Sequence, residues 1–175
     1  GRTVRFGLAT SGDSDDDGRI GVGWRLIADN LDSRASGEIR IRDQSSPDGI
    51  TLDVSTRSLT RLVGQQVGGP AAYRGVFRGD AAQWRLEGSV DLIAADVASY
   101  RAQRIRGPLN IQVRQGRLDL DGDLQVAGGS SAGLFGGLLG ASPRLSFEAL
   151  RQADGALLLE RIDLTGQALT VTGSG

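Results

Sequence analysis

The 175-residue chain contains no histidine, cysteine or methionine, and all of its twenty basic residues are arginine. Without histidine or cysteine it can build neither a Ser-His-Asp triad nor a thiolate nucleophile, and it offers no nitrogen or sulfur ligand to a metal. Disulfide bonds are excluded too, which leaves the redox compartment undetermined. These absences make an enzyme the least expected class of protein, and we predict no cofactor.

The chain is also poor in aromatic residues, in net charge and in long apolar runs. Aromatic residues make up 5% of the sequence and the formal net charge is −1, so no electrostatic attraction to nucleic acid or to anionic lipid is expected. No apolar run approaches the roughly 20 residues of a membrane-spanning helix, and no signal peptide is recognisable. Because both ends read as strands, we predict that residues 1–175 are a single fragment of a longer repeating domain.

Apolar and charged residues alternate along most of the chain. In GRLDLDGDLQVA, residues 116–127, the leucines and the valine fall on one parity, whereas arginine and aspartate fall on the other. Side chains alternate across a strand with period two, so this segment is a strand with one dry and one wet side. The pattern recurs in about ten segments, one of them expected to begin at Pro108. The sequence therefore predicts a mainly β protein.

The period changes in two places. In SLTRLVGQQV, residues 58–67, leucine and valine recur at i, i+3, i+4 and i+8, which predicts a short amphipathic helix with Ser58 as its N-cap. A second insertion, SSAGLFGGLLG, covers residues 130–140 and is rich in glycine and leucine. It is interpreted either as an apolar flap over the sheet or as a connecting helix.

Two short helices cannot cover about ten strands that are apolar on one side. The sheet must therefore turn its apolar side onto itself, as a barrel, a sandwich or a U-shaped trough. Branched aliphatic residues and glycine dominate that side, whereas a sandwich needs bulkier side chains to reach interior packing density. We predict an elongated, curved antiparallel sheet that forms a U-shaped hydrophobic groove with one or two short helical insertions. The predicted lining residues are Ile20, Val22, Trp24, Leu26, Ile39, Ile41, Ile50, Leu52, Val54, Trp84, Leu86, Val90, Leu92, Leu109, Ile111, Val113, Leu118, Leu120, Leu124, Val126, Leu145 and Phe147.

Three stretches carry a resemblance to a known family. These are GRLDLDGDLQVAG, the insertion leading into GASPRLSFEA, and the final LLLERIDLTGQALTVTGSG. They resemble the TamB-like (translocation and assembly module) proteins of the AsmA-like superfamily, which are repeating β-groove, bridge-like proteins of the bacterial envelope. The likeness covers most of the chain and is most specific over residues 145–173.

The resemblance implies a fold, a location and two functions. The fold is a β-taco with an apolar interior, in the periplasmic part of an inner-membrane-anchored protein of a Gram-negative bacterium. The functions are phospholipid transfer between inner and outer membrane, and assembly and secretion of outer-membrane proteins. The implied partners are phospholipid or acyl chains, the outer-membrane barrel protein TamA, and unfolded strands of outer-membrane clients.

The residues themselves leave another class of protein open. A structural or adhesive β-solenoid module of a surface protein would bind no ligand and would close a dry core. Solenoids show tight repeat periods and stacked identical residues. This chain lacks both, which counts against the solenoid.

One acidic segment partly matches a calcium loop. In DSDDDG, Asp13, Asp15 and Asp17 occupy the first three ligand positions, and a glycine follows as the loop requires. The position of the bidentate glutamate is taken by Trp24, and the flanking segments read as strands rather than helices. We interpret the segment as a solvated acidic turn and expect no metal site.

A second acidic group lies along one strand and could chelate a cation. It consists of Asp119, Asp121 and Asp123. These residues alternate with leucine and glycine, so we interpret them as the wet side of the sheet.

Overall fold

A computed structural model describes the chain except for residues 1–3, 12–17, 64–66, 98–99, 133 and 153–154. The calcium-loop candidates Asp13, Asp15 and Asp17 lie outside the described residues. The described chain forms one 12-stranded sheet and two short helices, where the sequence predicts about ten strands and two helical insertions. The elements are β1 (Arg5–Ser11), β2 (Arg19–Ala28), β3 (Leu31–Arg40), β4 (Ser46–Thr56), α1 (Leu59–Val63), β5 (Ala71–Gly79), β6 (Trp84–Val97), β7 (Tyr100–Arg114), β8 (Arg117–Ala127), β9 (Ser130–Ser131), α2 (Leu134–Leu139), β10 (Arg144–Arg151), β11 (Leu157–Thr165) and β12 (Thr170–Ser174).

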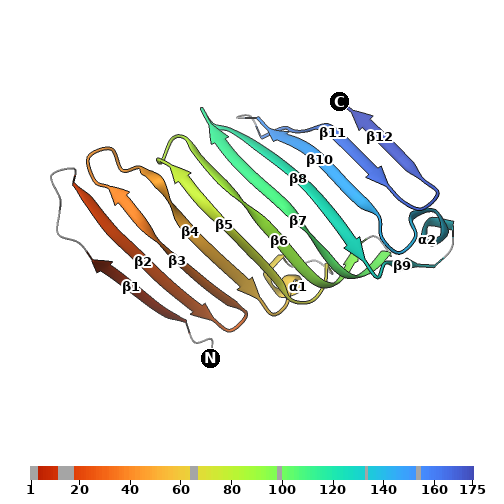
Figure 1. The fold of residues 1–175 in the computed structure, drawn as a ribbon, viewed down its shortest axis with the longest axis horizontal. Helices are drawn as coiled ribbons and strands as arrows, with labels where there is room; N and C mark the ends of the chain where they lie inside the picture. Colours follow the sequence, from red (N-terminus) through yellow and green to blue (C-terminus); the bar gives the residue numbers. More distant parts are fainter. Residues whose placement is uncertain (1–3, 12–17, 64–66, 98–99, 133, 153–154) are drawn as a thin grey trace.

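The sheet is open and follows the chain from one edge to the other. Its order is β1-β2-β3-β4-β5-β6-β7-β8-β10-β11-β12, with the short β9 paired to β7, and every pairing is antiparallel. Within the described strands, β1 and β12 stand at opposite edges and do not pair with each other, so the curved sheet does not close into a barrel (Figure 1). At about 4.8 Å per strand, the eleven strands in the row extend over about 48 Å. The prediction of an elongated, curved antiparallel sheet is confirmed.

Helix α1 is shorter than the sequence predicts, although its N-cap is confirmed. The hydroxyl of Ser58 accepts a hydrogen bond from the backbone N–H of Arg61 at 3.4 Å. Val67, predicted as the last apolar position of this helix, instead lies beyond it: its backbone N–H donates to the hydroxyl of Thr60 at 3.3 Å. Gly68 then forms a β-bridge with Ala95 of β6. The chain therefore returns to the sheet where the apolar period alone predicts another helical turn.

Helix α2 is a connecting helix rather than a flap. The first residues of the predicted 130–140 insertion form β9, so the helix covers only Leu134–Leu139. The carbonyl oxygens of Leu138 and Leu139 accept the backbone N–H groups of Ala168 and Gln167, at 2.9 and 3.0 Å. These bonds fasten α2 to the turn between β11 and β12. Both helices lie near the ends of the strands drawn at the bottom of Figure 1.

The molecule exposes far more surface than a compact protein of its mass. A folded 18.3 kDa monomer has a solvent-accessible surface of roughly 8,100 Å² by the usual scaling with mass. This chain has 11,360 Å², an excess of about 3,200 Å² over that expectation. Among the described residues the buried hydrophobic ones are few, mostly small, and scattered over the sheet. They are Ala35, Ile50, Ala95, Ala102 and Leu150. The excess fits a sheet that is one layer thick.

Candidate functional site

Cross-strand register places most apolar residues of the eleven strands in the row on one side, which we call the apolar face; Ile93 and Leu150 are among the exceptions. One row of paired residues crosses the whole sheet and shows how large and small side chains alternate along it. This row is Leu8, Trp24, Ala35, Leu52, Gly75, Gly88, Leu109, Gly122, Phe147, Ile162 and Gly173. The apolar face is made of this row and of the residues two and four positions away along each strand, up to the register shifts between Ser46 and Ile50 and between Glu148 and Ala149.

Every predicted lining residue except Ile41 lies on the apolar face. Ile41 follows β3 in a turn that the Arg40–Ser45 bridge closes, and its backbone N–H donates to the carbonyl oxygen of Gly18 at 3.0 Å. Its side chain is 51% exposed. Because the strand ends one residue earlier, the parity that predicted Ile41 as a lining residue no longer applies there.

The apolar face also contains large residues that were absent from the predicted lining. They are Phe6, Leu8, Leu31, Tyr73, Phe77, Ile105, Ile162, Leu164 and Val171. Two of them, Ile162 and Leu164, alternate with charged and polar residues and could have been found by parity. Tyr73 and Phe77 are harder to recognise, because Gly75 stands between them where a third apolar side chain would complete the pattern.

Aromatic side chains lie against three glycines of this row, Gly75, Gly88 and Gly122. Tyr73 reaches from β5 over β6, and its hydroxyl donates to the carbonyl oxygen of Leu109 in β7 at 3.1 Å. A Cβ on Gly88 would lie 2.6 Å from that hydroxyl oxygen, so only glycine leaves room for the tyrosine. Burial, with a smaller effect of the Glu87 carboxylate, raises the pKa of Tyr73. The same relation recurs in β8, where a Cβ on Gly122 would lie 2.7 Å from a ring carbon of Phe147.

One end of the apolar face holds a small aromatic hollow. It has a volume of about 250 Å³, and its walls include Ile39, Ile50 and the pair Phe77 and Trp84. The two rings are tilted by 34° with centroids 5.7 Å apart, which is within the range of favourable aromatic contact. Trp84 therefore packs against a neighbouring ring at this end of the sheet.

The opposite, polar face carries ion pairs between neighbouring strands. Arg104 binds Asp91 with two hydrogen bonds, of 2.8 and 2.5 Å. Arg144 binds Asp123 in the same bidentate way, and this contact holds the pKa of the Asp123 carboxyl below its usual value. The sequence interpretation of a solvated, charged side is consistent with this arrangement.

The carboxylates proposed as possible chelators on β8 are all engaged by donors. Asp119 accepts a hydrogen bond from Arg117 at 2.8 Å, Asp121 accepts one from the amide of Asn110 at 2.9 Å, and Asp123 is held by Arg144. Over the part of the chain that the structure describes, no group of three acidic, histidine or cysteine residues is placed to hold a metal ion.

Comparison with known proteins adds no relative to these observations. No protein-family model, no curated protein and no solved structure matches the chain. None of the described helices is long and apolar enough to cross a membrane. The apolar face, which crosses the eleven strands of the row, is the observation from which a function can be argued.

Proposed function

We propose that the apolar face binds acyl chains, as part of a TamB-like envelope protein whose periplasmic groove transfers phospholipid between the inner and the outer membrane. One observation carries the proposal: a continuous apolar surface crosses the eleven strands of the row, and no second layer of described residues covers it. Monomeric soluble proteins rarely leave apolar patches of more than a few hundred Å² exposed unless the patch binds something. The excess of about 3,200 Å² counts polar and apolar atoms on both faces, and it fits a single-layer sheet whose apolar face is uncovered.

The side chains of the apolar face suit a sliding guest. Burial contributes about 0.8 kcal/mol per CH₂ group, so a 16-carbon chain gains up to roughly 12 kcal/mol before ordering costs are subtracted. Aliphatic side chains and ring-covered glycines offer few polar atoms that would fix one position of the guest. An acyl chain can therefore bind in many registers with little preference, which suits a conduit better than a tight receptor.

The edges of the sheet support the related role in outer-membrane protein assembly. Within the described strands, β1 pairs only with β2, and its apolar-face residues Phe6 and Leu8 are 66% and 64% exposed. An unpaired strand edge next to apolar side chains can receive a client strand by β-augmentation. In this use the barrel protein TamA would be the outer-membrane partner. A ligand-free solenoid module is supported less well, because it needs a closed core and the sheet is open.

Native mass spectrometry of the purified chain, with lipid extraction, tests the proposal. We expect co-purified phospholipid or fatty acid in the wild type, and at least a tenfold loss of it in Leu120→Arg and Leu86→Arg, which put a charge on the apolar face. Gln112→Arg is the matched control, because it adds the same charge on the polar side of the neighbouring strand and should keep the lipid. Circular dichroism shows whether each variant is folded.

Two outcomes would contradict the proposal that acyl chains bind to the apolar face. A stable, lipid-free wild type that also fails to bind a fluorescent fatty acid contradicts acyl-chain binding. Lipid that is retained by folded Leu120→Arg and Leu86→Arg shows that it binds outside the apolar face.

A further inference from the structure

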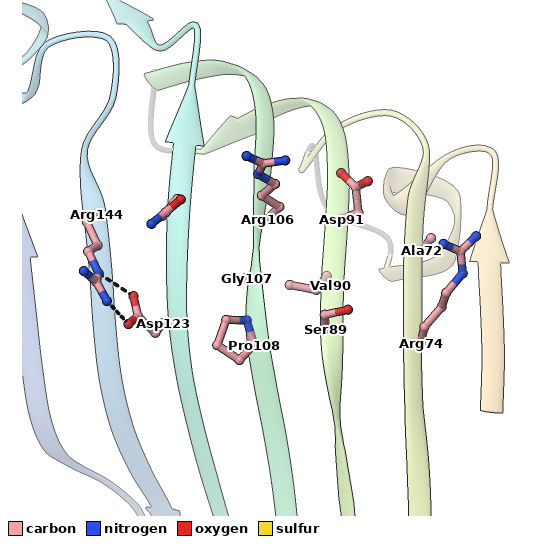
Figure 2. Close-up of a pocket in the computed structure, with 11 residues that line it drawn as sticks. Ala72, Arg74, Ser89, Val90, Asp91, Arg106, Gly107, Pro108, Asp123 and Arg144 are labelled. Carbon is pink, nitrogen blue, oxygen red and sulfur yellow. Dashed lines mark hydrogen bonds and ion pairs between the residues drawn. The ribbon is translucent and has the colours of Figure 1, made fainter. Parts of the chain in front are cut away.

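The polar face carries a hollow of its own, which the proposed function does not use. It has a volume of about 560 Å³ and lies over β5, β6, β7, β8 and β10 (Figure 2). We call it the arginine hollow, because Arg74, Arg106 and Arg144 line it together with Asp91, Asp123 and Gln125. Apart from Val90 and Gly107, its lining residues have the parity opposite to that of the apolar face, so their side chains and the apolar face lie on opposite sides of the sheet.

A break in the strand ladder accompanies the hollow. Gly107 and Pro108 stand in the middle of β7, and neither pairs with β8, although Arg106 and Leu109 on either side do. Proline cannot donate a ladder hydrogen bond and is otherwise confined to edge strands and bulges. β8 passes so close that a Cβ on Gly107 would lie 1.9 Å from the carbonyl oxygen of Asp123. Departures of this kind from the rules of local structure concentrate at functional sites.

Short side chains leave the hollow open where longer ones would fill it. Ala72, Ser89 and Pro108 line its base, on three adjacent strands. Arginines stand on either side: Arg74 is on β5 and Arg144 on β10, each about two strand spacings, or about 10 Å, from β7. Arg106 of β7 lies between them (Figure 2).

Arg106 is the cation in this hollow that makes neither a hydrogen bond nor an ion pair with a described residue, although its charge helps to lower the pKa of Asp91. Arg74 binds Asp53 at 3.0 Å, Arg144 binds Asp123, and the remaining carboxylate, Asp91, is held by Arg104. Within the described part of the chain, Arg106 forms no hydrogen bond and no ion pair, although it lies opposite Asp91 and Gln125 in register. These four arginines and three aspartates leave one positive charge, at Arg106.

We propose that the arginine hollow binds a phosphate group, with Arg106 as its principal contact. A guanidinium presents its donors in a planar fork that matches two oxygens of a phosphate. Arg74 uses only its Nε atom in its ion pair, so its remaining N–H groups can donate to further oxygens of the same group. A hollow of about 560 Å³ also has room for the remainder of a small phosphate ester. The phosphate can belong to a free small molecule or to a phospholipid headgroup.

Calorimetric titration of the whole chain with inorganic phosphate, at low ionic strength, tests the site. Arg106→Gln should weaken binding at least tenfold. Arg114→Gln is the matched control: Arg114 has the same strand, the same face and the same charge, but it lies outside the hollow and should change binding less than twofold. Ser89→Leu fills the base of the hollow without changing the charge and should also weaken binding tenfold.

Equal losses of phosphate affinity in Arg106→Gln and Arg114→Gln would show diffuse electrostatic attraction and would overturn the site. The absence of saturable phosphate binding by the wild type would overturn it as well. Two further arms identify the source of the phosphate: soluble glycerol phosphate, and sedimentation with phosphatidylglycerol vesicles against phosphatidylcholine vesicles. Binding that is lost in Arg106→Gln, in either of these two experiments, supports the site and identifies which kind of molecule carries the phosphate group. Leu120→Arg should leave phosphate binding unchanged, since it alters the opposite face, so failure of this site and failure of acyl-chain binding are distinguishable.

Discussion

The contact between Gly122 and Phe147 can be tested by a pair of substitutions that should depend strongly on each other. Gly122 of β8 is buried, and it lies opposite Phe147 of β10 in register. A Cβ at Gly122 would meet ring atoms of Phe147 at 2.7 and 2.8 Å and a methyl group of Leu109 at 3.3 Å. All three neighbours are side-chain atoms, so a shorter residue at position 147 should remove most of the clash.

The magnitude of the coupling follows from two opposing effects. Alanine in place of a strand glycine normally stabilises by about 0.5–1 kcal/mol, because the unfolded chain has less entropy to lose. With Phe147 present, Gly122→Ala overpacks the contact, which costs about 1–3 kcal/mol. In a Phe147→Val background the clash with the ring is gone, the contact with Leu109 stays, and the entropic gain remains. We therefore expect Gly122→Ala to destabilise the wild type and to stabilise the Phe147→Val variant, with a coupling energy of about 1 kcal/mol or more.

Urea denaturation of the four proteins in this cycle, followed by tryptophan fluorescence and circular dichroism, measures the coupling. The slope of the free energy against urea concentration should be the same in all four, since none of the changes alters the surface exposed on unfolding by much. A coupling energy below about 0.3 kcal/mol would mean that the two residues act independently. The ring of Phe147 would then not lie over Gly122, and the assignment of both residues to one face would be wrong.

Three further perturbations test other parts of the sheet. Tyr73→Phe removes the hydroxyl that donates to the backbone of β7 and should lower the free energy of unfolding by about 1 kcal/mol in urea titrations at pH 7. Because burial raises the pKa of Tyr73 in the folded protein, the wild type should lose stability as the pH rises above about 10, the pKa of tyrosine in the unfolded chain. The phenylalanine variant should lose less stability over the same range. Parallel profiles of stability against pH for the two proteins would contradict this. Gly37→Ala places a Cβ 2.6 Å from a backbone oxygen of β4, which no side-chain movement relieves, so thermal melting should occur several degrees lower than in the wild type. The hydrogen bond from Arg144 lowers the pKa of Asp123, so the stability that the ionised carboxylate contributes is present above pH 3.8 and is lost as the pH falls below that value. In Asp123→Asn the melting temperature should therefore fall less between pH 5 and pH 3 than it does in the wild type. The same fall in both proteins would show that the ion pair contributes nothing to stability.

Period-two alternation was enough to predict the sheet and much of the apolar face, although nine large residues of that face were not predicted. It works here because each strand pairs with the preceding one in the sheet order, so residues of one parity in neighbouring strands meet on one side. It fails where glycine stands on that parity, as between Tyr73 and Phe77, because glycine is compatible with either face. It also fails at Ile41, where a turn ends the strand.

Tertiary contacts decided the features that the sequence did not reveal. An apolar period of 3.6 favours helix up to Val67, but the β-bridge between Gly68 and Ala95 draws that segment into the sheet instead. Pro108 is a reasonable first residue of a strand, yet β7 runs through it from Tyr100 to Arg114. The arginine hollow was missed for the same reason, since only the assembled sheet places Arg74 and Arg144 on either side of that break.

The ion pairs of the polar face do more for the specificity of this fold than for its stability. Exposed pairs such as Arg74 with Asp53 contribute little free energy, because water and salt screen them. A slip of one residue between two strands would, however, carry every such charge to the apolar face and expose every leucine on the polar one. A single-layer sheet has no opposing layer to penalise that slip by steric mismatch. Where they are present, as between Arg104 and Asp91 and between Arg144 and Asp123, cross-strand charge pairs therefore add a penalty against such a slip.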